Sequence, residues 1–285
     1  MKIKYLGTGA SEGIPSVFCN CPVCQEARVK KGKHIRTRSQ AIIDGKLLVD
    51  FNADSYAHSI AYDIDFSKIA HVLITHTHQD HYYPGELLNR QIGLARPSMD
   101  TLTVYGSEDI KDSAYKQWQA LGKDDVLERQ NRLRFCFFKP YETKKIGDYL
   151  ITAIPATHTT AQPYIYAIEK DGKSLLYFND SGYLSQEATA FLRERAFQFD
   201  LVSYDCTWGA KDAGLDDALG SHMGVPNNII ARNRFIENGN YKQNTTSVIT
   251  HFSHNIERCG YDDMVGVAKD NGRSEEHTSE LQSRI

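Results

Sequence analysis

Three histidines and one aspartate fall within six residues of the sequence THTHQDH. The apolar run 71–74 precedes them and is typical of a buried strand, so the cluster is expected at the carboxyl end of that strand or in the loop beyond it. Residues two apart in an extended segment point the same way, so His76 and His78 can bind one ion together. Asp80 and His81 lie past the turn and can face a second ion. Imidazole nitrogens and carboxylate oxygens suit zinc, manganese or iron.

Further ligand-type residues lie just after expected strands or in loops, far along the chain from this cluster. They are His158, Asp180, His222 and His254. Sites of this kind gather their ligands at one edge of a scaffold, so we expect these side chains to meet the THTHQDH segment.

Asp50, Asp205 and His251 each follow an expected strand and have two interpretations. Asp50 can orient a metal-binding histidine or cap a helix over 52–61. Asp205 can orient a ligand or close a turn at the end of its strand. His251 can support a metal ligand from outside the ligand shell or be a plain buried histidine.

The sequence CNCPVC places three thiols within six residues, at Cys19, Cys21 and Cys24. Three thiolates can wrap one tetrahedral zinc ion, which would be structural because thiolates close the coordination shell. A fourth ligand must come from elsewhere in the chain. The candidates are Glu257, Cys259 and His34. The alternative is three free thiols in a surface loop.

The composition is that of an ordinary globular protein, with 41% hydrophobic and 24% charged residues among 285. The net charge of −3 does not indicate a protein that binds polyanions regardless of their sequence. No apolar run approaches the roughly 18 residues that span a bilayer, and the opening MKIKYL is a short amphipathic strand, not a signal peptide. We therefore expect a cytosolic protein without membrane contacts, whose six cysteines are reduced or metal-bound.

The last thirteen residues, 273–285, have no sustained periodicity and look like the translation of a sequencing-library adapter. They are set aside from fold reasoning, as a fusion scar would be. We expect the natural C-terminus to be missing, and a final strand with it. The body, residues 1–272, is predicted to form a single domain.

Apolar strands alternate with helices along this body, and no low-complexity linker divides it. Strands are expected at 3–6, 41–44, 46–50, 71–74, 102–105, 133–138, 149–154, 164–169, 174–178, 201–204 and 247–250. Helices are expected at 52–61, 84–92, 107–121, 184–196, 226–238 and 261–269. This order favours an α/β (α+β) protein in which two β-sheets pack face to face with helices outside.

These residues together resemble a known family. The pattern HxHxDH, followed by His158, Asp180 and His254, is similar to that of the metallo-β-lactamase superfamily of binuclear hydrolases, over residues 1 to about 272. Within it, the segments LGTG and SHM and the CxCxxC loop most resemble the PhnP group, the phosphoribosyl cyclic phosphate phosphodiesterases. The resemblance implies an αββα sandwich with two divalent ions, zinc or manganese, at the active site and one structural zinc.

The resemblance also implies a role for each ligand. The first ion would be held by His76, His78 and His158, the second by Asp80, His81 and His254, and Asp180 would bridge both. A bridging carboxylate sets two ions about 3.5–4 Å apart, so that they share a hydroxide able to attack phosphorus. His222 would act as general acid on the leaving oxygen, which makes His222 and Asp80 the catalytic candidates. Glu257 occupies the place where this group can supply the fourth ligand of the cysteine site.

The implied reaction is hydrolysis of a small cyclic phosphodiester similar to 5-phosphoribosyl 1,2-cyclic phosphate, by an enzyme whose relatives are often homodimers. One alternative is tRNA 3′ processing of the ribonuclease Z type. It expects an inserted basic arm, which the sequence lacks, so nucleic acid is not the expected partner. The other is a cofactor-biosynthesis protein of the PqqB type acting at one metal, which would lack a complete ligand set.

Overall fold

The computed structural model describes residues 1–285 except 215–219, 257–258, 272–273, 276–281 and 285. Two seven-stranded sheets form its centre, with strand orders β14-β1-β2-β3-β4-β5-β6 and β13-β12-β11-β10-β9-β8-β7. The first sheet contains β1 (Lys2–Gly7), β2 (Gln40–Ile43), β3 (Leu47–Val49), β4 (His71–Leu73), β5 (Leu102–Gly106), β6 (Leu133–Phe137) and β14 (Gln282–Arg284). The second contains β7 (Thr143–Ile146), β8 (Tyr149–Pro155), β9 (Tyr164–Lys170), β10 (Lys173–Phe178), β11 (Phe199–Asp205), β12 (Tyr241–Thr250) and β13 (Ser274–Glu275).

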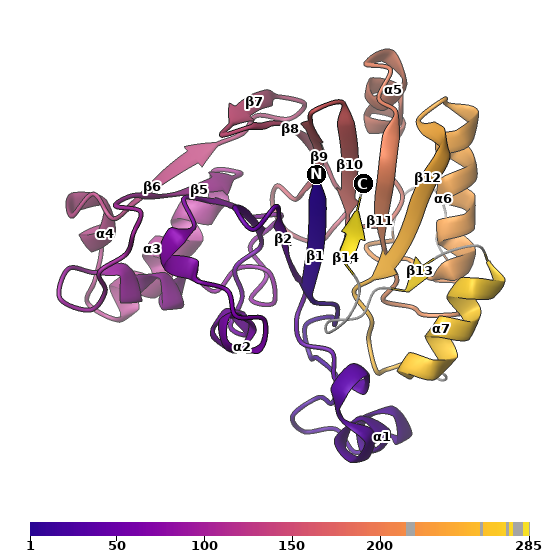
Figure 1. Ribbon diagram of the computed structural model, residues 1–285, viewed down its shortest axis with the longest axis horizontal. Coiled ribbons are helices and arrows are strands. Elements are labelled where there is room, and N and C mark those ends of the chain that lie inside the picture. Colours follow the sequence, from indigo (N-terminus) through magenta and orange to yellow (C-terminus); the bar gives the residue numbers. More distant parts are fainter. Residues whose placement is uncertain (215–219, 257–258, 272–273, 276–281, 285) are drawn as a thin grey trace.

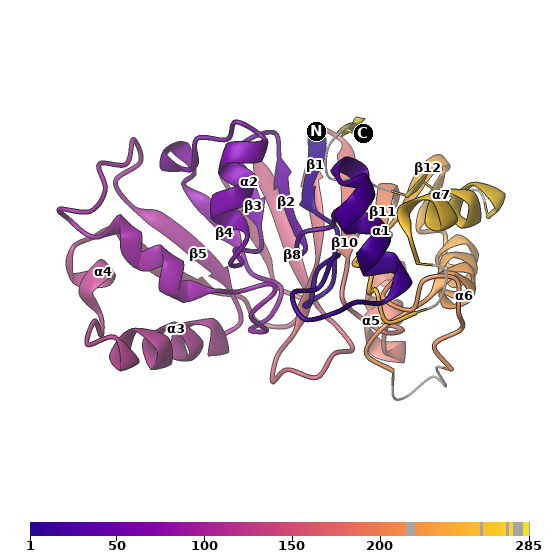
Figure 2. The same ribbon diagram turned by 90° about the horizontal axis from the view of Figure 1, so that it is seen from below.

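Helices cover the outer face of each sheet (Figure 1). On the first sheet lie α2 (Ser55–Ala61), α3 (Asp109–Ala120) and α4 (Val126–Arg129), and on the second lie α5 (Gln186–Glu194), α6 (Val225–Glu237) and α7 (Tyr261–Asp270). Helix α1 (Pro22–Lys30) lies apart from both layers, in front of the sheets in Figure 2. Three short 3₁₀ helices complete the described elements: η1 (Gly32–His34), η2 (Phe66–Lys68) and η3 (Pro84–Arg90). The expected αββα sandwich is confirmed.

Strand side chains alternate between two apolar layers, as the period of two requires. Val248 packs between the two sheets, whereas its neighbour Ile249 packs under the helices of the second sheet. On the first sheet, Leu47 faces the other sheet and Leu48 faces the helical layer that contains Trp118. Because both faces of these strands are buried, the strands read as continuous apolar runs in the sequence.

Several details differ from the sequence-based expectations. The CNCPVC motif runs into α1, which begins at Pro22, a residue favoured in the first turn of a helix. The helix expected at 84–92 is the 3₁₀ helix η3. Strand β7 and helix α4 are present although neither was expected. The short strands β13 and β14 pair with β12 and β1, and both lie in the segment that was set aside. Strands β1–β6 and β7–β12 form the two sheets without them.

The strands that lead to the predicted ligands share one direction within each sheet. β3 and β4 are parallel, and so are β10, β11 and β12. Their carboxyl ends therefore lie at one edge of each sheet, where side chains from distant parts of the sequence can meet. None of the helices in the described ranges is long and apolar enough to cross a bilayer.

Candidate metal centre

The first group of ligand-type side chains comes from the loops that follow β4, β8 and β10. His76 Nε2 lies 3.2 Å from His78 Nδ1, and His158 Nε2 lies 3.0 Å from the same nitrogen. Asp180 Oδ2 is 3.2 Å from His76 Nε2 and 3.4 Å from His158 Nε2. Nitrogen and oxygen ligands around a tetrahedral zinc ion are about 3.3 Å apart. These four residues therefore fit one metal ion, as the family resemblance implied.

A second group adjoins the first and consists of Asp80, His81, Asp180 and His251. His81 Nε2 lies 3.2 Å from Asp80 Oδ2 and 3.3 Å from His251 Nε2. Asp180 Oδ2 is 3.0 Å from His81 Nε2 and 3.5 Å from His251 Nε2. The same oxygen of Asp180 thus faces both groups, so this carboxylate is placed to bridge two ions.

The expectation that His254 joins the second group is corrected by the structure. His251, the residue directly after β12, occupies that position and is 2% exposed. Its backbone is left-handed, with φ at 64°, so the chain turns at His251 as it leaves the strand. His254 lies three residues farther along, and its Nδ1 contacts the cysteine motif instead.

The cysteine motif and His254 form a separate group of four ligand-type residues. His254 Nδ1 lies 3.4 Å from Cys19 Sγ and 3.6 Å from Cys21 Sγ, and Cys24 completes the group. A sulfur and a nitrogen ligand on one tetrahedral zinc ion are about 3.6 Å apart, so these residues fit a structural metal ion.

The other candidates for the fourth ligand do not join this group. His34 lies near Glu26 and Asp262, and Cys259 is buried against Gly209. Glu257 lies outside the described residues. None of the six cysteines, all of which lie in the described ranges, forms a disulfide.

Two aspartates outside the ligand groups orient the second group. Asp50 Oδ2 is 2.7 Å from His81 Nδ1, the ring nitrogen opposite the one that faces Asp180. Asp205 Oδ2 is 3.1 Å from His251 Nδ1 in the same way. Carboxylates in such positions fix the tautomer of a metal-binding histidine. The orienting interpretation therefore describes both aspartates, and Asp50 caps no helix, because the residue before α2 is Asp54.

Thr207 is a member of the site that sequence reasoning missed. Its Oγ1 donates to Asp205 Oδ2 at 2.7 Å and lies 2.8 Å from His251 Nδ1 and 3.3 Å from His222 Nδ1. A threonine two residues after a strand end has no metal-ligand signature, so only its proximity to Asp205 could have drawn attention to it.

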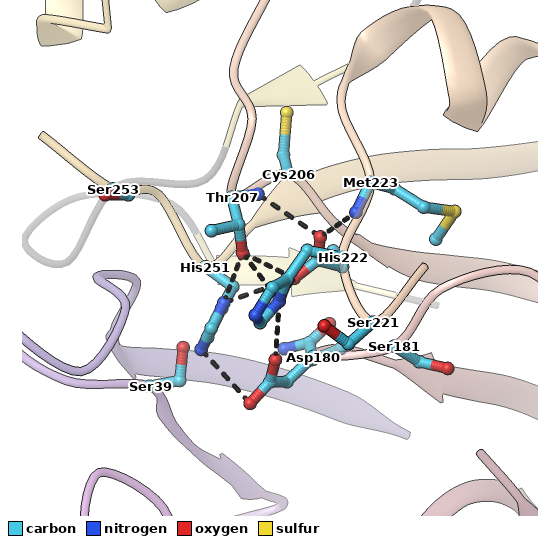
Figure 3. A network of polar contacts seen from close by, with 12 residues as sticks. Ser39, Asp180, Ser181, Cys206, Thr207, Ser221, His222, Met223, His251 and Ser253 are labelled. Carbon is cyan, nitrogen blue, oxygen red and sulfur yellow. Dashed lines mark hydrogen bonds and ion pairs between the residues drawn. The ribbon is translucent and has the colours of Figure 1, made fainter. Parts of the chain in front are cut away.

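His222 lies at the more exposed side of the centre. Its Nδ1 is 2.9 Å from Asp180 Oδ1, and 28% of its side chain is exposed. Figure 3 shows His222 beside His251, between Asp180 and Thr207, and their ring planes are 16° from parallel. Burial alone would lower the pKa of His222, but the Asp180 and Asp205 carboxylates raise it to about 10.

The charges of the centre also fit two divalent ions. Four of its carboxylates are buried, those of Asp50, Asp80, Asp180 and Asp205, and within the described ranges their ion pairs are with imidazoles, none with Lys or Arg. Burial would lower the pKa of His251, but Asp180 and Asp205 raise it to about 9. Positive charge nearby is therefore needed to stabilise these buried carboxylates. Two divalent ions with neutral imidazoles would supply four positive charges for the four negative ones.

Comparison with known proteins identifies the family. A family model described as a beta-lactamase superfamily domain matches residues 48–234. The exodeoxyribonuclease WalJ of Streptococcus pneumoniae is 27% identical over 154 residues, which are 51% of this chain and 52% of that protein, so the chain spans about half the length of this relative.

Two solved structures share the fold over the whole chain. A diphosphatase from the PhnP family superposes with a TM-score of 0.71 at 17% identity, covering 100% of this chain and 97% of that one. Zn²⁺-bound PqqB from Methylobacterium extorquens superposes with a TM-score of 0.72 at 19% identity, covering 100% of both chains. The family match and the shared sandwich show that this chain belongs to the beta-lactamase superfamily and has the metallo-β-lactamase fold.

Proposed function

We propose that this protein is a binuclear metal-dependent phosphodiesterase that hydrolyses a small cyclic phosphodiester of the 5-phosphoribosyl 1,2-cyclic phosphate type. The observation that carries the proposal is the place of Asp180. Its Oδ2 lies between two groups of imidazoles, and its Oδ1 lies 2.9 Å from the partly exposed His222. A dinuclear centre with an acid beside it is what phosphodiester hydrolysis needs.

Two divalent ions bound here would activate water and neutralise the charge on the phosphoryl oxygens. The chain's own residues would do the rest. His222 presents Nδ1 to Asp180, so Nε2, at the opposite side of the ring, is the atom that can donate a proton to the leaving sugar oxygen. Asp205 Oδ2 and Thr207 Oγ1 lie 3.6 Å and 3.3 Å from the same Nδ1, so Asp180, Asp205 and Thr207 together hold that edge of the ring in place.

Zinc or manganese is the proposed catalytic metal, since both accept imidazole and carboxylate ligands. Zinc is proposed for the thiolate group, and PqqB, which shares the fold, is described as Zn²⁺-bound. The proposed partner is a small phosphorylated molecule in the cytosol, and a homodimer is the proposed assembly.

The test is hydrolysis of bis(p-nitrophenyl) phosphate and of ribose cyclic phosphates by the purified protein, stripped with a chelator and reloaded with zinc or manganese. We expect activity only after reloading, and a loss in His222→Ala that is larger on the sugar substrate, because p-nitrophenolate leaves without a proton. Elemental analysis should give about three metal ions per chain. Absence of both activities in the loaded protein would refute the proposal.

Cleavage of DNA from an end is the second candidate, because the relative in Streptococcus pneumoniae is an exodeoxyribonuclease. The same centre could hydrolyse a DNA phosphodiester, but the net charge of −3 disfavours a long polyanion. Release of nucleotides from linear duplex and single-stranded DNA, measured beside the cyclic phosphates, distinguishes the two. Faster turnover of DNA would replace the first candidate by the second.

A further inference from the structure

The two kinds of metal group share one short segment of chain. His251 contributes to the second group, with Nε2 3.5 Å from Asp180 Oδ2. His254 contributes to the thiolate group, with Nδ1 3.4 Å from Cys19 Sγ. Only two residues separate these histidines, so an ion in the thiolate group holds one end of a segment whose other end supplies a catalytic ligand.

The segment between the two histidines leaves little room to absorb a displacement. Phe252 is fully buried, donates its N–H to Thr8 O at 2.9 Å and accepts from Ala10 N at 2.9 Å. The hydroxyl of Ser253 donates to the Glu12 carboxylate. A shift of the loop that contains Thr8, Ala10 and Glu12 would therefore move Phe252, and with it the neighbouring His251.

The partners of this segment themselves lead to the thiolates. The stretch from Thr8 to Glu12 continues directly into the cysteine motif, and Ser16 N donates to Cys24 Sγ at 3.4 Å. An ion in the thiolate group therefore fastens this N-terminal loop to the segment after β12. Without the ion, those two parts of the chain keep the contacts at Phe252 and Ser253 and those of His254 and Asn255 with Glu12, but lose the link through the thiolates.

The first catalytic group is built differently. His76 and His78 follow β4, and His158 follows β8, so none of the three belongs to the segment 251–254. Occupancy of the thiolate group should therefore change the two catalytic ions unequally.

We propose that an ion in the thiolate group raises the affinity of the second catalytic group for its ion and leaves the first group unchanged. This regulation rests on the binuclear centre of the proposed function. Disturbing the support of a metal-binding histidine typically weakens affinity about 10- to 100-fold, which is the expected size of the coupling. Because coupling between sites is reciprocal, the second catalytic ion should also tighten the thiolate site.

Two metals of different softness can separate the groups. Cadmium, a soft ion, prefers the thiolates, and its binding there is followed by the cadmium–thiolate absorption in the ultraviolet. Manganese, a hard ion, prefers the histidine and aspartate groups, and free manganese is counted by electron paramagnetic resonance. The experiment titrates metal-free protein with Mn²⁺, with and without one prior equivalent of Cd²⁺, and uses no substrate, so its outcome is independent of any phosphodiesterase activity.

We expect Cd²⁺ to tighten the binding of one of the two Mn²⁺ ions about 10- to 100-fold. The double variant Cys19→Ala/Cys21→Ala should show no cadmium–thiolate absorption and no tightening. Cys136→Ala, which removes a thiol on β6 far from the motif in sequence, should behave as the unmodified protein. If Cd²⁺ changes neither Mn²⁺ affinity in the unmodified protein, or changes both equally, the coupling is refuted. The titration of the unmodified protein with and without Cd²⁺ therefore tests the coupling even if the double variant does not fold.

Discussion

Replacing Asp50 by Asn should remove the tautomer of His81 that can bind a metal ion, without changing the shape of the site. Asp50 Oδ1 accepts from Thr75 N at 2.8 Å and from Thr75 Oγ1 at 2.9 Å, so the amide oxygen of Asn will stay there. The amide NH₂ then takes the place of Oδ2, 2.7 Å from His81 Nδ1. Because NH₂ only donates, Nδ1 must accept, and the ring proton moves to Nε2. A protonated Nε2, which faces Asp180, cannot bind an ion.

We expect Asp50→Asn to bind the second catalytic ion about 10- to 100-fold more weakly, which is about 1.4–2.7 kcal/mol, with the first ion unaffected. Calorimetric titration of metal-free protein with Zn²⁺ or Mn²⁺ measures both affinities. Asp54→Asn is the matched control, because Asp54 pairs with Arg38, not with a ligand of the centre. Two ions bound by Asp50→Asn as tightly as by the unmodified protein would refute the tautomer argument.

Three further predictions follow from single contacts. Burial lowers the pKa of His58 to about 4, so the fold favours its neutral form. The free energy of unfolding should therefore fall by about 3 kcal/mol as the pH decreases from 6.5 to 4. Urea unfolding of metal-free protein measures this fall, and His58→Gln should lack it. A Cβ at Gly182 would lie 1.6 Å from Gly220 O, so Gly182→Ala should displace Gly220 and with it His222, the proposed general acid, and lower kcat about 10- to 100-fold; an unchanged kcat would contradict this. Thr207→Val removes the hydroxyl 2.8 Å from His251 Nδ1 and should weaken the second ion about tenfold, whereas Thr207→Ser should restore it in the same titration.

Local patterns in the sequence predicted the two packed sheets and the first pair of ligands, whereas the ligand set of the centre was implied by the family resemblance. Strands buried on both faces read as apolar runs, and their ends could be located to within a few residues. The pair His76 and His78 followed from the period of an extended segment, and the structure brings both to one group with His158.

Local patterns could not predict that His251, and not His254, joins the second group of ligands. Both histidines follow β12 within four residues, and which of them turns into the centre depends on the left-handed backbone at His251. Nothing in the local sequence requires that conformation. The fourth partner of the thiolates was equally hidden, because Cys19 and His254 are 235 residues apart in the sequence. The fold brings them together where Gly9, after β1, pairs with Phe252, after β12.

Three residues of the centre adopt a backbone conformation that is unfavourable for residues other than glycine. Asp50, Asp180 and His251 are all left-handed, with φ of 65°, 51° and 64°. Such residues cost about 1 kcal/mol or more each, and the buried carboxylates beside them add to that cost. Ions that bind only the folded chain would offset it, since a concentration of 100 times Kd stabilises the fold by about 2.7 kcal/mol per site. The positions least favourable for folding are thus those that orient the ligands of the centre.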